Sequence, residues 1–310
     1  MSASPPSLLI AARDAAAHQH YPQGALYMVA TPIGNLADIG LRALHVLSLA
    51  DTVACEDTRH TAGLLQGYGL HKPLLAVHEH NEAEAALVVV QRLRDGQRVA
   101  YVSDAGTPGV SDPGARLAQV VTAAGLRCVP LPGPSSITAL MSVAGEAGWD
   151  GQFVFRGFLP TKAGERLREV QALGTQPHAT VVLEAPHRIE ALAKDLATLG
   201  ERKITVGREL TKQFEEVAQM PAQAFPDWLR ADAHRTRGEF VLLLHPLHPD
   251  QADTGLPAES LRVLDLLLAE LPVKSAVRLC AEISGQPRNA LYQAALDRKT
   301  TGSKGPSEAD

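Results

Sequence analysis

The chain contains little cysteine and no long apolar run. Its three cysteines, Cys55, Cys128 and Cys280, lie far apart, which excludes a Cys-x-x-Cys metal pair and a disulfide framework. No window reaches the ~18 apolar residues of a membrane span, and residues 1–23 lack the basic start and apolar core of an export signal. We therefore expect a cytoplasmic protein with no transmembrane helix.

The familiar catalytic fingerprints are also missing. No G-x-G-x-x-G segment follows the first expected strand, and there is no Walker loop, H-E-x-x-H or G-x-S-x-G. The usual dinucleotide-binding, phosphate-loop, zinc peptidase and α/β-hydrolase interpretations lose their main support. Two histidines and two glutamates lie close together at 78–82, but further ligands cannot be identified, so we expect no metal site.

What the sequence does contain is an alternation of short β-rich runs with amphipathic stretches, which is typical of α/β domains. At 310 residues the chain exceeds the usual size of one hydrophobic core, so two main domains are expected. A Pro-Gly-Pro segment at 132–134 separates them. The expected strands are 26–30, 52–55, 74–77, 99–103 and 127–131, followed by 153–158, 180–184, 204–208, 213–218 and 239–245.

These elements predict five segments. They are a flexible N-terminal extension (1–23), an N-terminal α/β domain (24–133), a C-terminal α/β domain (134–247), a small helical module of helix-turn-helix type (256–298) and a disordered tail (299–310). A Pro-rich linker is expected at 246–258.

The charge is unevenly distributed along the chain. The net charge is −5, yet residues 151–212 carry 10 basic and 7 acidic groups. A polyanion should therefore bind to the second domain, although this excess is also compatible with ordinary scatter.

Several polar or glycine-rich loops follow expected strands, at the edge where open parallel sheets bind ligands. Segments 30–36 and 103–109 would bring backbone amides close to a small molecule, and Asp104 adds a carboxylate. Segment 55–60 combines acidic, basic and imidazole groups, although Asp57 can equally act as a helix N-cap while Arg59 neutralises Glu56. Segments 184–188 and 207–212 should face these loops across a cleft.

Taken together, nine segments in order resemble one family, the 16S rRNA cytidine 2′-O-methyltransferases of the ribosomal RNA small subunit methyltransferase I type. They are 31–39, 56–61, 79–82, 103–114, 132–136, 157–162, 184–188, 207–212 and 238–240. The residues around 290–292 also resemble the C-terminal helix-turn-helix of that family. The resemblance implies two α/β domains of the tetrapyrrole methylase type, a cleft that binds S-adenosylmethionine, a homodimer, and a target cytidine in the decoding region of 16S rRNA in the small ribosomal subunit.

Carried over by position, the resemblance also implies which residues bind the cofactor. From the first domain these are Pro32, Gly34, Asp104, Gly106, Thr107 and Pro108, and from the second Ser135, Ser136, Glu184 and Pro186. The sequence departs from the expected pattern at Arg156, Leu183 and Gly207.

Methyl transfer to a ribose hydroxyl requires alignment and removal of a proton. The candidate bases are Asp104 and Asp57, with Arg59 and His60 orienting the substrate. The residues expected to contact RNA are Lys162, Arg166, Arg168, Arg188 and Lys212. Two alternatives remain open: a tetrapyrrole (precorrin-type) methyltransferase, and a non-catalytic RNA-binding factor of ribosome assembly.

Overall fold

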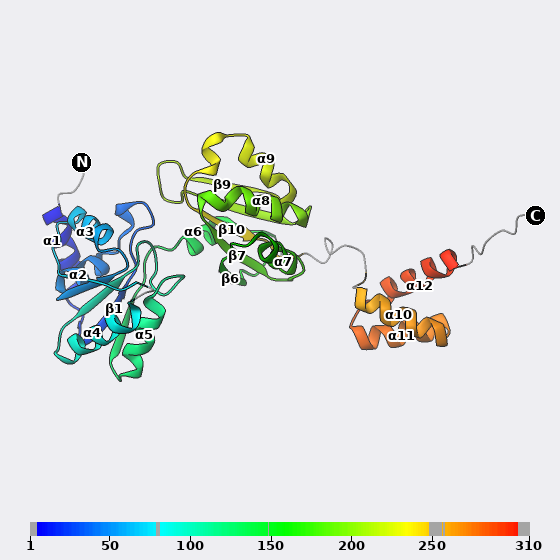
Figure 1. The fold of residues 1–310 in the computed structure, drawn as a ribbon, viewed down its shortest axis with the longest axis horizontal. Helices are drawn as coiled ribbons and strands as arrows, with labels where there is room; N and C mark the ends of the chain where they lie inside the picture. Colours follow the sequence, from blue (N-terminus) through cyan, green and yellow to red (C-terminus); the bar gives the residue numbers. More distant parts are fainter. Residues whose placement is uncertain (1–4, 79–80, 148, 248–255, 257, 303–310) are drawn as a thin grey trace, which may run out of the picture. The chain divides into compact units, whose positions relative to one another are not determined.

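The structure is a computed structural model that describes residues 5–78, 81–147, 149–247, 256 and 258–302. The chain divides into two compact units, one ending at Pro246 and the other beginning at Leu247. The first unit contains two five-stranded sheets, and the second contains three helices (Figure 1). Among the described residues, no helix is long and apolar enough to cross a membrane.

The first sheet is entirely parallel and has the strand order β3-β2-β4-β1-β5. Its strands are β1 (Ala25–Val29), β2 (Thr52–Cys55), β3 (Leu74–Ala76), β4 (Val99–Val102) and β5 (Arg127–Leu131). The helices that follow β1 to β4 are α2 (Leu41–Leu49), α3 (Thr58–Gly67), α4 (Glu82–Arg94) and α5 (Gly114–Ala123).

Alternating side chains of these strands build a core on each face of the sheet. Tyr27 and Val29 pack with α2 and α3, whereas Leu26 packs with α4 and α5. The same alternation separates Ala100 from Tyr101 on β4. Helices therefore cover both faces (Figure 1), and the carboxyl ends of the strands remain available for ligand binding.

The N-terminal segment differs from the flexible extension that the sequence predicts. Residues Pro5–Ala16 form helix α1, in which Ala12 and Ala16 are fully or almost fully buried and pack with the core on the α2 face. Leu8 and Leu9 pack against the same cluster. An apolar face at i, i+4 and i+8 thus holds α1 in place.

The second sheet is mixed and has the order β6-β7-β10-β8-β9. Its strands are β6 (Phe153–Phe158), β7 (Ala179–Glu184), β8 (Lys203–Arg208), β9 (Glu216–Pro221) and β10 (Phe240–Leu244), of which only β6 and β7 pair in parallel. One face is covered by α7 (Ala163–Gly174), α8 (Ile189–Leu196) and α9 (Phe225–Arg230). Strand β9 begins three residues later than predicted, so Gln213 and Phe214 belong to the β8–β9 hairpin loop.

The opposite face of this sheet binds helix α6 (Ser136–Val143), which follows β5 of the first sheet. Ile137 and Leu140 of α6 pack against Val181 and Val241. Ile33, from the loop after β1, belongs to the same cluster. This shared core joins the two sheets and brings their loops together.

The second unit is a bundle of α10 (Ala258–Glu270), α11 (Val273–Ser284) and α12 (Arg288–Gly302). Leu264, Val277, Cys280, Leu291 and Ala295 form its core. Helix α12 includes the first residues of the expected tail, 299–302, whereas 303–310 and most of the expected linker lie outside the described residues.

Candidate active site

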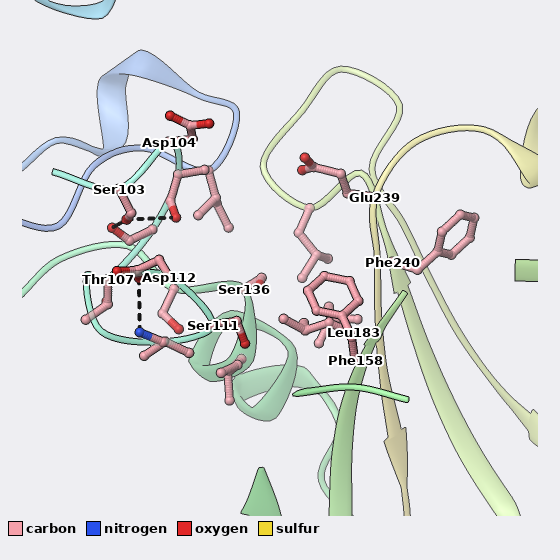
Figure 2. Close-up of a pocket in the computed structure, with 18 of the residues that line it drawn as sticks. Ser103, Asp104, Thr107, Ser111, Asp112, Ser136, Phe158, Leu183, Glu239 and Phe240 are labelled. Atoms are coloured by element: carbon pink, nitrogen blue, oxygen red, sulfur yellow. Dashed lines mark hydrogen bonds between the residues drawn. The ribbon is translucent and has the colours of Figure 1, made fainter. Parts of the chain in front are cut away.

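A cavity of about 400 Å³ lies between the loops of the two sheets (Figure 2). The first sheet supplies the loops that follow β1, β2 and β4, and the second sheet supplies the ends of β6 and β7 and the start of β10. This size falls in the range of ~300–1,000 Å³ typical of small-molecule sites. The polar lining residues are Glu56, Ser103, Asp104, Thr107, Ser111, Asp112, Ser135, Ser136, Glu184 and Glu239.

The loop after β4 is held in place by a bridge to the loop after β1. The amide of Thr31 donates to the carbonyl of Gly106 and the amide of Gly106 donates to the carbonyl of Thr31, both at 3.0 Å. Gly106 has φ +82°, a conformation that glycine adopts without strain. The hydroxyl of Thr107 donates to the carbonyl of Pro134 at 3.1 Å, which connects the same loop to the segment before α6.

Three carboxylates converge on the first-domain wall. The amide of Asp104 donates to Glu56 Oε1 at 3.3 Å, and Asp104 Oδ1 accepts from the amide of Asp57 at 3.3 Å. Asp112 accepts from the amides of Gly109 and Gly114 at 2.8 and 2.7 Å. Burial raises the pKa of Glu56, and the neighbouring charges of Asp104 and Asp112 act in the same direction.

On the second-domain wall, Glu184 is buried at the end of β7. Its Oε1 accepts from the amide of Ala185 at 2.9 Å and pairs with Arg188 Nε at 3.0 Å. Its Oε2 is buried and accepts no hydrogen bond from the residues that the structure describes. A buried acceptor of this kind is costly unless a ligand supplies a donor.

Backbone strain in the described chain is concentrated around this cavity. The three non-glycine residues with positive φ are Ser111 (63°), Glu209 (50°) and Thr211 (67°). Ser111 lines the cavity, and the other two flank Leu210, which also lines it. Strained conformations of this type persist where the surrounding structure enforces them, most often at functional sites.

Two family models and several curated relatives match most of this chain. A family model described as tetrapyrrole (corrin/porphyrin) methylases matches residues 25–226, and one described as the RsmI C-terminal HTH domain matches 254–299. Ribosomal RNA small subunit methyltransferase I of Pseudomonas aeruginosa is 46% identical over 278 residues, which span 89% of this chain and 98% of the relative. The protein of the same name from Neisseria meningitidis serogroup A is 47% identical over 277 residues, 89% and 94% of the two chains.

This chain belongs to the ribosomal RNA small subunit methyltransferase I family. The predicted family is thereby confirmed.

Solved structures show the same fold. The cobalt precorrin-4 methyltransferase CbiF has a TM-score of 0.52 at 17% identity, with 73% of this chain and 98% of CbiF covered. Uroporphyrin-III C-methyltransferase from Thermus thermophilus, solved with S-adenosyl homocysteine, has a TM-score of 0.51 at 17% identity, with 71% and 96% covered. At such identities the likeness concerns the fold alone. The two sheets and the match to the tetrapyrrole methylase model confirm the predicted class of two α/β domains of that type.

Most of the residues expected to bind a cofactor in this family line the cavity. They are Asp104, Gly106, Thr107, Ser135, Ser136, Glu184 and Pro186. Pro32, Gly34 and Pro108 are not among the lining residues. A Cβ built on Gly34 would lie 2.4 Å from Lys212 Cγ, so this glycine makes room for a side chain of the second domain.

Of the four candidate catalytic residues, only Asp104 lines the cavity. Asp57 caps helix α3, since its Oδ1 accepts from the amides of Arg59 and His60 at 2.8 and 3.4 Å. Hydrogen bonds from Arg59 lower the pKa of Asp57. Arg59 pairs with Asp57 at 3.2 Å rather than with Glu56, and its side chain is 91% exposed. The contacts of Asp57 fit helix capping rather than catalysis.

The five residues expected to contact RNA also differ in exposure. Arg166 is buried and pairs with Asp195 at 2.6 Å. Arg188 pairs with Glu184 and also donates to the carbonyl of Leu159 at 2.5 Å. Both arginines therefore make their contacts within the domain. Lys162 and Arg168 are exposed. Lys212 pairs with Glu209 and Glu239 at 2.8 and 3.1 Å beside the cavity.

Several lining residues were not among the predicted site residues. Glu56 lies next to Asp57 in the sequence, and Glu239 lies in the 238–240 segment that resembles the family, so both positions carried a signal. Phe158 and Leu210 lie in the 157–162 and 207–212 segments, and Leu183 is a departure from the family pattern, so these positions also carried a signal. Val241 carried none beyond its place near the start of a strand. Of the histidine-containing run at 78–82, residues 79 and 80 lie outside the described residues.

Proposed function

We propose that this protein transfers a methyl group from S-adenosylmethionine to the 2′-hydroxyl of a cytidine in the decoding region of 16S rRNA. The observation that carries the proposal is the similarity to ribosomal RNA small subunit methyltransferase I over 89% of the chain. The match to the tetrapyrrole methylase model, residues 25–226, includes every lining residue except Glu239, Phe240 and Val241.

The cavity suits S-adenosylmethionine in size and chemistry. Leu183, Leu210 and Val241 offer an apolar surface for a purine. Glu184 Oε2, a buried acceptor without a partner among the described residues, complements an amino donor. The carboxylates of Glu56 and Asp104 complement the positive charge of the cofactor.

When bound, S-adenosylmethionine supplies an electrophilic methyl group on a cationic sulfur. The chain must then align the ribose oxygen with that methyl group, and good alignment can be worth ~7–11 kcal/mol. We assign proton removal to Asp104, which lines the cavity. Glu56 positions Asp104 by accepting its backbone amide.

The RNA should approach over exposed basic side chains. Lys162 lies just before α7 and Arg168 lies on it, in the segment with a basic excess, and both are accessible to phosphate. An enzyme that modifies ribosomal RNA in a bacterium works in the cytoplasm, and by resemblance to the superfamily we expect a homodimer.

The direct test is transfer of radiolabelled methyl groups from S-adenosylmethionine to purified ribosomal subunits that lack the modification. Label should enter the RNA of the small subunit, with the large subunit as a matched control. Binding of the small subunit without incorporation of label would instead support a non-catalytic assembly factor.

A further inference from the structure

The β8–β9 hairpin, whose loop residue Leu210 lines the cavity, carries an exposed aromatic ring. Phe214 is 69% exposed, the largest value among the large apolar side chains of the described chain. Its sequence neighbours Gln213 and Glu215 are polar and exposed. A ring in this setting offers little area to a protein partner but a complete face to a planar ligand.

The backbone of an exposed arginine, Arg237, lies close to the backbone of Phe214. The buried guanidinium of Arg208 donates from Nη1 to the carbonyl of Phe214 at 3.2 Å and from Nε to the carbonyl of Arg237 at 2.9 Å. One guanidinium spans only a few ångströms, so Phe214 and Arg237 are spatial neighbours. Arg237 is exposed, and within the described part of the chain no carboxylate pairs with it.

The hairpin is held rigidly in this conformation. The amide of Thr211 donates to Glu215 Oε2 at 2.6 Å, and the amide of Glu215 donates to the carbonyl of Lys212 at 3.1 Å. Glu209 Oε1 accepts from Lys212 Nζ and from the amide of Glu239 at 2.8 and 2.9 Å. The backbone that carries the ring therefore loses little conformational freedom on binding.

The same hairpin forms part of the cavity wall. Leu210 of the hairpin loop lines the cavity, and the stem of Lys212 packs over Gly34 of the first domain. Glu239, directly before β10, lines the cavity as well. Figure 2 shows Glu239 and Asp104 on opposite sides of the cavity. Phe214 follows Leu210 by four residues, so the exposed ring belongs to the same loop as a lining residue of the cavity.

We propose that Phe214 and Arg237 together bind a single-stranded segment of the substrate RNA that extends from the cavity over the β8–β9 loop. Phe214 stacks on an unpaired base, and Arg237 contacts a phosphate of the same strand. The combination of an aromatic face with a neighbouring cation is the usual means of holding single-stranded RNA without reading its sequence. The inference rests on the proposed function, since it assumes an RNA substrate.

The test compares full-length variants for binding to a fluorescein-labelled single-stranded RNA of mixed sequence. Phe214→Ala should weaken binding about ten-fold, which corresponds to about 1.4 kcal/mol, whereas Phe214→Trp should retain wild-type affinity. Arg237→Ala should weaken binding and reduce the salt slope by about one. Leu87→Ala and Arg94→Ala are matched controls, because these exposed side chains lie on α4 and do not line the cavity.

Two further measurements separate the possible outcomes. Affinity for S-adenosylmethionine should not change in Phe214→Ala, and sedimentation should show the same oligomeric state as the wild type. Unchanged RNA affinity would overturn the inference, as would a shift in oligomeric state, which would show that Phe214 packs between copies of the chain. If the wild type itself fails to methylate small-subunit RNA, the proposed function fails. If the wild type methylates this RNA but Phe214→Ala binds single-stranded RNA with unchanged affinity, only the inference is contradicted.

Discussion

Glu56 Oε1 accepts the backbone amide of Asp104 at 3.3 Å, which joins the loops after β2 and β4 at the cavity wall. The bond places two carboxylates close together in a partly buried site. Burial, together with the charges of Asp104 and Asp112, raises the pKa of Glu56. Ionising Glu56 in the folded protein therefore costs free energy that the unfolded chain does not pay.

Replacing Glu56 with glutamine should stabilise the protein at neutral pH. A raised folded-state pKa means that the associated stability is present below the unfolded value, near 4.5, and is lost as the pH rises through the folded value. The Tm of Glu56→Gln should thus match the wild type near pH 4 and exceed it at pH 7 to 8. Thermal unfolding across this range measures the difference. Glu84→Gln, at an exposed position on α4, should give no such gain.

Asp104 should be far more important for turnover than its neighbour Asp57. Asp104→Asn preserves shape but removes the proton acceptor, so we expect a loss of about 100-fold in methyl transfer from a correctly folded protein. Asp57→Asn retains a good helix cap and should stay within a few-fold of the wild type. Steady-state kinetics on small ribosomal subunits compares the two. A near-normal Asp104→Asn variant would remove its assigned role.

Gly34 and Lys212 should behave as a coupled pair across the two domains. An alanine at position 34 would contact the stem of Lys212 and would also be strained at φ +154°. Gly34→Ala should lower both Tm and methyl transfer, and Lys212→Ala should relieve the clash but not the strain. The Tm loss in the double variant should therefore be smaller than the sum of the single losses. Strict additivity would show that the side chain of Lys212 does not restrict this site.

The basic residues on and just before α7 should have different roles according to their exposure. Arg168→Glu and Lys162→Glu should raise the KM for small ribosomal subunits and reduce its salt dependence, with the Tm unchanged. Arg166→Ala should instead destabilise the protein by about 3 kcal/mol, because it leaves the carboxylate of Asp195, only 17% exposed, without its partner. Denaturant unfolding and kinetics distinguish these effects. An equal loss of RNA affinity in all three variants would contradict the division.

The strands could be predicted from sequence because their β-rich runs are short and bounded by turn residues. Strands β2, β5 and β6 begin and end where predicted. The start of β9 could not be predicted, since Gln213 and Phe214 continue an extended pattern and only the strained turn at Glu209 and Thr211 excludes them from the strand. Tertiary contacts, rather than local propensity, decide such a boundary.

Two misassignments could have been avoided from helical periodicity. Arg166 lies four residues before Val170 and seven before Leu173, on the buried face of α7, whereas Arg168 lies on the opposite face. The spacing of Ala12 and Ala16 similarly indicates a packed helix. The choice between Glu56 and Asp57 is different, because adjacent side chains at a strand end diverge according to a backbone path that the sequence does not reveal.

The central claim is that the cavity supports methyl transfer to a ribose of small-subunit RNA. The most direct measurement is mass spectrometry of nucleosides from small ribosomal subunits incubated with the wild-type protein and S-adenosylmethionine that carries a deuterated methyl group. The account predicts one labelled species, 2′-O-methylcytidine, in the fragment that contains the decoding region. Label on a base would contradict it, as would RNA that remains unlabelled after this incubation.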